Sequence, residues 1–389
     1  MVIMETTHKL QTIATQMHLE PAEETGSAGT PCGARTAHNW KEELGVFHAA
    51  LPGGKTIPLL KTMLTTACER NCAYCPFRAG RNYRRTTFKP EEMAQAFMSM
   101  NRAGMVQGLF LSSGIIKGGA ATQDRLLDTV DILRRQHQFR GYVHLKIMPG
   151  AERAQVERAM QLADRLSINL EAPTPQRLAV LAPQKQFLAE LLSPLQWVEE
   201  MRQTQPSRLG WNGRWPSTVT QFVVGAAGDS DVELLSATEY LYHRLHLSRT
   251  YFSAFHPIAD TPLAQMPATP LMRQNRLYQA SFLLRDYGFD LESLPFDPEG
   301  NLPLDRDPKR AWAETALADN PVELNRASRE ELLQIPGIGP QSANTIVAAR
   351  RRATLRELEE LHAIGLRTTP MAPFVLLDGK RPTYQMRLF

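Results

Sequence analysis

Short apolar segments alternate with longer amphipathic segments from residue 57 onward, and this alternation constrains the fold more than any other feature. Six segments have the length and residue types of strands: 57–66, 108–113, 142–148, 165–172, 217–225 and 249–255. Helical patterns follow at 90–104, 122–136, 151–163, 232–245 and 271–288. Strand then helix, repeated, indicates parallel strands joined by crossovers. We expect an α/β fold, with an open barrel preferred and a doubly wound sheet as its competitor.

The ends of the chain differ from this middle part. Residues 1–50 begin with a helical pattern and continue with a segment rich in Gly, Ser, Thr and Pro, so we expect an N-terminal helix and a flexible segment. The barrel would occupy residues 51–294. Residues 295–320, rich in Pro and Asp, would be a linker, and residues 321–389 a small all-α module with a tail.

Bulk composition narrows the class of protein. The chain has 389 residues, of which 43% are hydrophobic and 22% charged, as in ordinary globular proteins. Four cysteines in this length fit a reducing cytoplasm, and we expect neither a signal peptide nor a membrane span. A net charge of +4 is compatible with a nucleic-acid partner but does not imply one.

Three of the four cysteines, Cys68, Cys72 and Cys75, directly follow the first predicted strand. An odd trio cannot pair internally, and such close neighbours would strain a disulfide. They would lie at the carboxyl end of a barrel strand, where barrel enzymes place their sites. Three thiolates can bind three irons of a [4Fe–4S] cluster and leave the fourth iron open. A zinc site completed by a distant histidine and a ferredoxin-like electron carrier are alternatives, although no second C-x2-C pair is present.

The spacing C-x3-C-x-aromatic-C, with Tyr74 in the aromatic place, resembles the signature of radical S-adenosylmethionine (SAM) enzymes. The resemblance implies a partial (β/α)6 barrel, a [4Fe–4S] cluster on Cys68, Cys72 and Cys75, and SAM at the open iron. In that superfamily the reduced cluster donates an electron that cleaves SAM, and the resulting 5′-deoxyadenosyl radical removes a hydrogen atom from the substrate.

The same resemblance suggests which residues contact SAM, in addition to Tyr74. Ser112, Ser113 and Gly114 occupy the place of a short motif, often Gly-Gly-Glu, that contacts the methionine amino group, although the acidic residue is missing here. Asn169 and Glu171 share one face of the fourth strand and fit the ribose contacts.

Gly225, at the end of the fifth strand, would let the backbone approach the adenine of SAM closely. The contacts assigned to SAM have structural alternatives. Ser-Ser-Gly is a common turn, and Glu171 either caps the next helix or pairs with His144 or Lys146. Cys32 stands alone as a stray thiol, a hydrogen donor or an extra ligand. No residue is assigned as catalytic.

Residues 325–352 carry the second informative pattern. A helix through EELLQ, capped by Asn325 or Ser328, leads into the turn IPGIG, and a second helix starts at Pro340. Gly337 and Gly339 permit positive φ, and N–H groups at such a turn beside a helix N-terminus form a phosphate site.

This pattern resembles the helix-hairpin-helix motif of DNA repair and DNA uptake proteins, which holds the nucleic-acid backbone without sequence readout. The resemblance suggests that the nucleic acid contacts Gly337, Ile338, Gly339, Gln341, Ser342 and Arg350. A weaker copy at residues 355–369 is expected to pack against the first hairpin without binding phosphate. A protein contact or a packing role is the alternative.

The order of these motifs over residues 40–365 is similar to one bacterial family, the DNA modification/repair radical SAM proteins. The genes of that family tend to accompany a uracil-DNA-glycosylase-like partner. The similarity implies an enzyme that makes a carbon radical on a nucleic acid, most simply a DNA base, with a separate reducing electron donor. An RNA- or tRNA-modifying radical SAM enzyme is the enzymatic alternative. A DNA-bound iron–sulfur redox sensor or glycosylase accessory protein is the non-enzymatic one.

Overall fold

The computed structural model describes residues 2–17, 44–50 and 56–384. Cys32 lies outside these residues. The chain divides into two compact units: a first unit of residues 1–229 and 240–269, and a second unit of residues 230–239 and 270–389. The expected linker at 295–320 contains a helix, Pro308–Ala316. The domain boundaries given above stay predictions.

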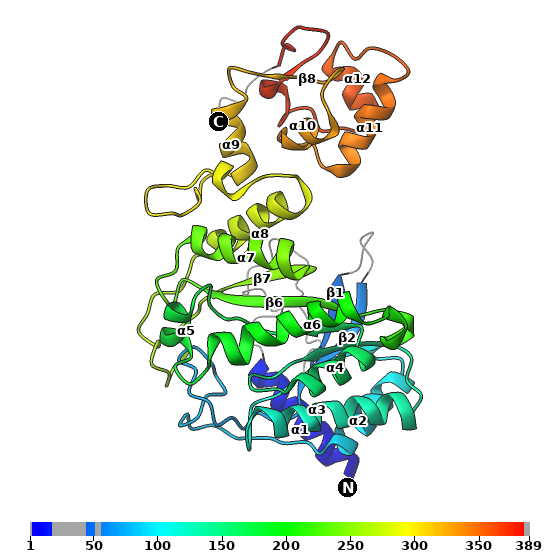
Figure 1. Cartoon of the computed structure of the whole chain (residues 1–389), viewed down its shortest axis with the longest axis vertical. Coiled ribbons are helices and arrows are strands. Elements are labelled where there is room, and N and C mark those ends of the chain that lie inside the picture. The colour runs from blue at the N-terminus through cyan, green and yellow to red at the C-terminus, as the bar shows by residue number, and fades with distance from the viewer. Residues whose placement is uncertain (1, 18–43, 51–55, 385–389) are drawn as a thin grey trace. The chain divides into compact units, whose positions relative to one another are not determined.

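A curved sheet of seven strands in sequential order forms the centre of the first unit (Figure 1). Its strands are β1 Val46–Ala50, β2 Thr56–Met63, β3 Gly108–Ser112, β4 Tyr142–Lys146, β5 Arg165–Ser167, β6 Ser217–Val224 and β7 Arg249–Ala254. Strands β2 to β7 pair in parallel, and β1 pairs antiparallel with β2. The sheet is a half-barrel, as expected, and all carboxyl ends of β2 to β7 lie along one rim.

Helices cover the outer face of this half-barrel. Those on this face include α2 Pro90–Arg102, α3 Gly119–Asp131, α4 Arg153–Leu162 and α6 Ser193–Thr204. The chain also forms α1 Val2–Met17, α5 Pro175–Leu181 and α7 Asp231–Leu245. Figure 1 shows α2, α3, α4 and α6 side by side along the sheet. Helix α2 buries Met93, Phe97 and Met100 while Glu91 stays exposed, which is the amphipathic pattern that predicted it.

All six predicted strands are present, but the fourth ends at Ser167 and not at 172. Asn169 and Glu171 therefore lie beyond the strand and do not share its face as expected, and Glu171 has a φ of 66°. The doubly wound alternative is wrong, because the strand order runs from β2 to β7 without reversal. Strand β1 was not predicted, since residues 1–50 were expected to hold only a helix and a flexible segment. Val46 and Ala49 are buried there, and β1 pairs antiparallel with β2, so this short segment completes the sheet edge.

The second unit contains α8 Leu271–Asp286, α9 Pro308–Ala316, α10 Arg329–Gln334, α11 Pro340–Arg350 and α12 Leu358–Ala363. Two-residue strands β8 Val322–Glu323 and β9 Val375–Leu376 pair in parallel. Its core includes Leu332, Ile335, Ile338, Ile346 and Leu361, all nearly inaccessible to solvent. In the described ranges, none of the helices has the length and apolar character needed to span a bilayer.

Candidate functional site

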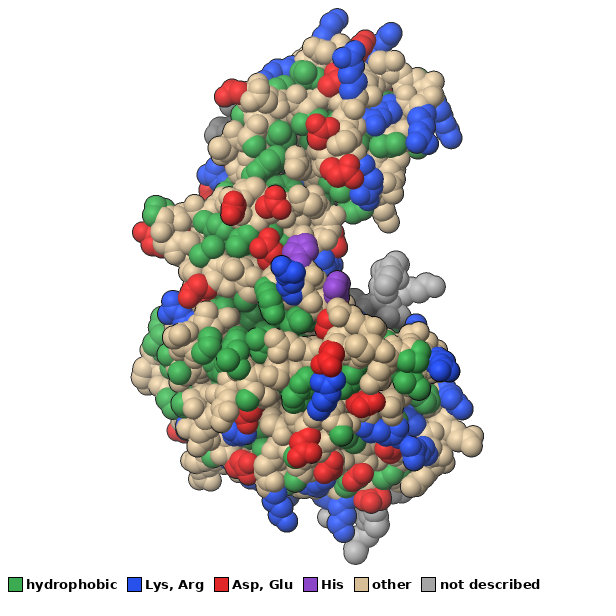
Figure 2. Space-filling model, in the orientation of Figure 1, with side chains coloured by type: hydrophobic (Ala, Val, Ile, Leu, Met, Phe, Trp, Pro, Cys, Tyr) green, Lys and Arg blue, Asp and Glu red, His purple; other side chains and the backbone are tan. Residues whose placement is uncertain are grey.

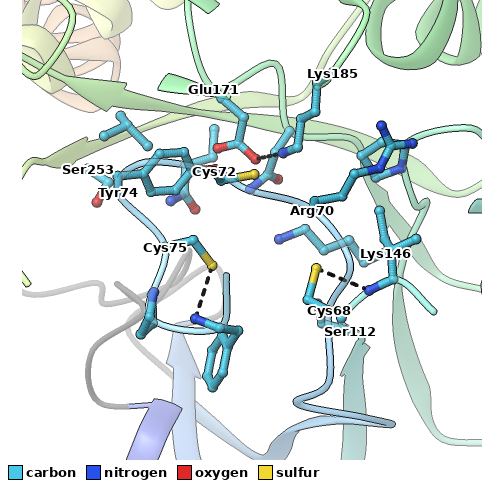
Figure 3. A pocket seen from close by; sticks show the side chains of 18 of the residues that line it. Cys68, Arg70, Cys72, Tyr74, Cys75, Ser112, Lys146, Glu171, Lys185 and Ser253 are labelled. Carbon is cyan, nitrogen blue, oxygen red and sulfur yellow. Dashed lines mark hydrogen bonds and ion pairs between the residues drawn. The ribbon is translucent and has the colours of Figure 1, made fainter. Parts of the chain in front are cut away.

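The cysteine loop, residues 64–88, leaves the carboxyl end of β2. Backbone hydrogen bonds attach it to the rest of the rim: Glu69 N–H donates to Ile115 C=O at 2.8 Å and Ala73 N–H to Leu181 C=O at 2.7 Å. Cys72 is buried, and Cys68 and Cys75 are half-buried. Figure 3 shows the three sulfur atoms around one space. The fold thus places all three thiols on the barrel rim, as the sequence predicts.

The thiols have defined polar surroundings. Cys68 Sγ accepts from Ile115 N–H and Cys75 Sγ accepts from Phe77 N–H, both at 3.4 Å. Burial raises the pKa of the Cys72 thiol, and the nearby Lys185 ammonium opposes that shift. Backbone donors and a buried cation are what a negatively charged iron–sulfur cluster requires around its thiolates.

Arg85 holds the cysteine loop closed at its base. Its guanidinium donates to the carbonyls of Thr66 at 2.9 Å, Phe77 at 2.7 Å, Arg78 at 2.8 Å and Arg81 at 3.2 Å. Thr66 precedes the first cysteine, and the other three residues follow the last one. One side chain therefore joins both ends of the segment that carries the thiols. No local sequence signal separates this arginine from its neighbours, and it was not predicted.

A pocket at the rim contains most of the predicted site residues. Its lining includes the three cysteines together with Tyr74, Ser112, Ser113, Gly114, Asn169 and Glu171. Gly225 directly follows β6, with φ of 94° and its N–H donating to the Asp229 carboxylate, but it is outside the lining. The roles of these residues toward SAM stay predictions.

Glu171 has a protein partner that the sequence did not identify. Its carboxylate accepts from Lys185 Nζ at 2.9 Å, and both side chains are under 10% exposed (Figure 3). Burial alone would lower the pKa of Lys185, but the facing Glu171 carboxylate, together with Cys72, raises that pKa above its ordinary value. Burial and the Glu171 carboxylate raise the pKa of the Tyr74 phenol.

The pairing of Glu171 with Lys146 or His144 suggested by the sequence differs from this arrangement. Lys146 lines the pocket, whereas His144 is buried and stacks on Phe110 with ring centroids 4.2 Å apart. Lys185 comes from the segment after α5, fourteen positions beyond Glu171. Only the tertiary fold brings that lysine to the rim, so strand spacing could not reveal the pair.

The residues at the rim fit a cluster and a nucleotide cofactor. Ser113 Oγ is buried and has no protein partner in the described part of the chain. A Cβ on Gly114 would lie 2.2 Å from the Ala67 carbonyl oxygen and 3.2 Å from Cys68 Cβ, so only glycine lets β3 approach the cysteine loop this closely.

The spread of the three thiols bears on the zinc alternative. Among the residues that the structure describes, no three His, Cys, Asp or Glu side chains are grouped closely enough to hold one metal ion. A [4Fe–4S] cluster is larger and takes each thiolate at a different iron, so three thiols around one pocket suit it better.

The hairpin in the second unit is built as the sequence predicts. Ser328 caps α10, and its capping box with Glu331 settles the choice between Asn325 and Ser328. Gly337 has φ of 82°, a left-handed conformation that favours glycine. Ile338 is buried between the two glycines and anchors the turn to the core.

The hairpin turn presents backbone donors. Within the described chain, the N–H groups of Gly337, Gly339, Gln341 and Ser342 donate to no protein acceptor. Gln341 is exposed, and Ser342 is half-buried. Such a row of amides beside the N-terminus of α11 suits a phosphate. Arg350 faces inward instead, since its guanidinium donates to the carbonyls of Leu324 at 2.9 Å and Ala327 at 2.6 Å.

The weaker second copy packs against the first turn. Gly365 has φ of 85°, like Gly337, and α12 leads into it. A Cβ on Gly337 would lie 3.0 Å from Pro370 Cβ and 3.6 Å from the Arg367 carbonyl oxygen. Figure 2 shows Lys and Arg side chains gathered over the part of the second unit that carries α11 and α12. Exposed arginines there are Arg351, Arg352, Arg356 and Arg367.

Trp211 and Trp215 lie in the segment before β6, at the amino ends of the strands and away from the pocket. The Trp211 ring lies 3.8 Å from the Arg134 guanidinium, and Trp215 Nε1 donates to the Gln205 carbonyl at 3.4 Å. These internal contacts favour packing as the role of the two indoles.

Comparison with known proteins adds to this geometry. Residues 62–202 match the radical SAM superfamily and residues 321–349 match the helix-hairpin-helix motif. No curated protein matches the chain.

Several solved structures are similar in fold to part of the chain. The FeFe-hydrogenase maturase HydG from Carboxydothermus hydrogenoformans has 15% identity and a TM-score of 0.46 over 58% of this chain and 51% of that chain. Methylornithine synthase (PylB) has 13% identity and a TM-score of 0.46 over 59% of this chain and 62% of that chain. The radical SAM methyltransferase TsrM from Kitasatospora setae has 11% identity and a TM-score of 0.41 over 67% of this chain and 45% of that chain. The chain thus spans about half the length of the first of these proteins.

Proposed function

We propose that this protein, a radical SAM enzyme, forms a radical on a nucleic-acid substrate, with a base in DNA as the target and its repair or modification as the outcome. A [4Fe–4S] cluster and SAM are the typical cofactors of the superfamily. In this chain Cys68, Cys72 and Cys75 would hold the cluster. When bound, these cofactors supply a carbon radical that removes a hydrogen atom from the substrate.

One observation carries the enzymatic half of the proposal: three thiols meet at one rim pocket, at the carboxyl ends of the strands. Around them, the chain's own residues have separable tasks. Ser113 Oγ, buried without a protein partner, is a hydrogen-bonding group available to the amino end of SAM. Tyr74 and Asn169 line the same wall and would orient the nucleoside part.

The buried Glu171–Lys185 pair sets the electrostatics of that wall. Its two charges are held 2.9 Å apart, so the carboxylate is fixed in direction and the ammonium lies near Cys72. A fixed carboxylate can accept from ribose hydroxyls on its remaining lone pairs. A fixed cation near a thiolate favours negative charge on the cluster.

The nucleic-acid half of the proposal is supported by the hairpin amides and the arginines around them. Free N–H groups at Gly337 and Gly339 would bind backbone phosphates, and nearby arginines would add sequence-independent attraction. Such binding gives affinity, not base choice, so the rim pocket would select the target. A base inside a duplex must be unstacked to enter a pocket of this kind.

Partners and location complete the proposal. Reduction of a cluster needs an electron donor, and the family resemblance suggests a uracil-DNA-glycosylase-like protein as a functional partner. The thiols of a cluster-binding loop are kept reduced in the cytoplasm, where we place the protein.

Anaerobic incubation of the reconstituted protein with reductant, SAM and DNA tests the reaction. We expect 5′-deoxyadenosine by mass spectrometry, together with altered nucleosides from damaged or undamaged duplexes. The Cys72→Ala variant should form neither product. Cys32→Ala removes a cysteine outside the loop and should keep both. Absence of 5′-deoxyadenosine from protein with an intact cluster would contradict the proposal.

Retention of nucleic acid at fixed salt tests the substrate class. Matched DNA and RNA duplexes should be compared over a salt series, since backbone binding weakens as salt rises. Stronger retention of RNA would favour the RNA-modifying alternative.

A further inference from the structure

Lys309 lies beneath the hairpin turn. This side chain of α9 is only 9% exposed, and its Nζ donates to the Ile338 carbonyl at 2.6 Å. The same Nζ lies 4.7 Å from the centre of the Tyr287 ring. The Tyr287 hydroxyl would in turn be 3.3 Å from a Cβ on Gly339. Lysine and tyrosine thus support the turn from its inner side.

The peptide that Lys309 holds is the one that faces a ligand. The carbonyl of Ile338 and the N–H of Gly339 belong to a single planar peptide group. A cation that binds the carbonyl fixes this plane and polarises it, so the N–H becomes a stronger donor. In the described chain that N–H has no acceptor, which leaves it available to an anion.

Packing alone does not account for a lysine at this position. Among the described residues, Lys309 forms no salt bridge, so its charge is buried with a carbonyl and an aromatic ring as its main support. Burial lowers the pKa of Lys309 from 10.5 to about 7, with Asp307 opposing the shift. A charge buried in this way costs stability that an apolar side chain would not.

We propose that Lys309 is a positioning residue of the hairpin's phosphate site, where its ammonium group orients and polarises the Ile338–Gly339 peptide for an anionic nucleic-acid backbone. This inference rests on the proposed function of the hairpin. The protonated form of Lys309 then binds more tightly than the neutral form.

Binding should therefore depend on pH near neutrality. Among the residues that the structure describes, Lys309 faces the Ile338 carbonyl and the Tyr287 phenol from the segment after α8. Asp307, at the cap of its own helix, is the charged group that acts on it. Burial raises the pKa of Tyr287, so this phenol stays neutral throughout the pH range in which Lys309 titrates. Affinity should rise as pH falls through about 7, where Lys309 takes up its proton.

Fluorescence anisotropy with a labelled DNA duplex, from pH 6 to 8.5 at constant ionic strength, tests the inference in the full chain. We expect the wild type to bind DNA about fivefold more tightly at the lowest pH of the series than at the highest, as a charge-assisted donor should. Lys309→Met should bind weakly at every pH. Lys309→Arg, which cannot lose its charge in this range, should bind tightly at every pH. Lys380→Met removes an exposed lysine of the same unit and should retain the wild-type profile.

The salt dependence separates Lys309 from residues that touch phosphate. Because Lys309 would act through the peptide, Lys309→Met should leave the slope of log affinity against log salt unchanged. A wild-type pH profile in Lys309→Met, or an equal loss in Lys380→Met, overturns the inference while the hairpin function stands. A wild type that binds no DNA at any pH contradicts the hairpin function and this inference with it.

Discussion

The cysteine loop and the hairpin turn are two solutions to the same problem, namely how an irregular segment is held in one shape. The loop presents side chains and is held by Arg85, which donates to four carbonyls. The turn presents backbone amides and is held by Lys309, which donates to one carbonyl. In both cases a single cation fixes the backbone, from within the loop itself for Arg85 and from helix α9 for Lys309.

The difference between the two cations is instructive. A guanidinium has five donors in a fixed plane and keeps its charge throughout the range in which proteins are handled, so it suits a loop that must always be closed. An ammonium is a point charge that loses its proton readily when buried. The cysteine loop should therefore be insensitive to pH near neutrality, and the hairpin turn should respond to it.

The largest expected effect comes from removing the Arg85 hydrogen bonds that close the cysteine loop. Arg85→Met removes four charge-assisted hydrogen bonds, each contributing about 1.5 to 3 kcal/mol. We expect most of the iron and sulfide to be lost after reconstitution, measured per chain. Arg84→Met, an exposed neighbour, should retain a full cluster. Normal iron content in Arg85→Met would show that the cysteine loop closes without the Arg85 guanidinium.

The second prediction concerns Lys185, which would lack a carboxylate partner, as Lys309 does among the described residues, once Glu171 is replaced. Glu171→Gln leaves Lys185 buried without its carboxylate, which should lower the free energy of unfolding by about 3 kcal/mol. Glu190→Gln breaks the more exposed pair with Arg70 and should cost about 1 kcal/mol or less. Denaturant unfolding under anaerobic conditions measures both. Equal losses would mean that burial of the pair at the rim is unimportant.

The third prediction concerns glycine in the hairpin turn. Gly337→Ala and Gly379→Ala both place a side chain at positive φ, with about 1 kcal/mol of strain each. Only at Gly337 would the new Cβ also meet a neighbour, Pro370 Cβ at 3.0 Å. We expect Gly337→Ala alone to weaken DNA binding, with the cluster spectrum unchanged. Unaltered DNA affinity would remove the turn from the binding site.

The smallest effect is on stability against pH. Because the pKa of Lys309 is lowered to about 7, the unfolded chain holds a proton that the folded chain lacks between about 7 and 10.5. Lys309 therefore lowers stability most at pH 7 and below, and this penalty fades as pH rises toward 10.5. Lys309→Met should raise the melting temperature, relative to wild type, more at pH 7 than at pH 10. A gain that does not vary with pH would contradict the buried charge.

The parts of the molecule that follow from local pattern were predictable. Strand alternation located β2 to β7, cysteine spacing located the thiols, and the IPGIG turn located the left-handed Gly337. These features depend on residue identity at short range. Helices α5 and α6 were not among the predicted segments, although α6 buries Leu195, Val198 and Met201 at helical spacing.

The supporting cations could not be predicted in the same way. Lys185 and Lys309 have ordinary sequence surroundings and acquire their roles from partners that the fold brings near. Arg85 contacts carbonyls of its own loop, but no local pattern separates it from the neighbouring arginines. Lys309 and Ile338 are separated by 29 positions. Arg350 shows the converse: it has the residue type and place of a phosphate contact, yet its guanidinium donates to two carbonyls of its own unit.

Metal and sulfide analysis of anaerobically reconstituted protein, with electron paramagnetic resonance after reduction, tests the central claim most directly. We predict about four irons and four sulfides per chain, and a reduced-cluster signal that shifts when SAM is added, as an open iron requires. Cys72→Ala should abolish the signal. A single zinc per chain without iron, or a signal indifferent to SAM, would contradict the account.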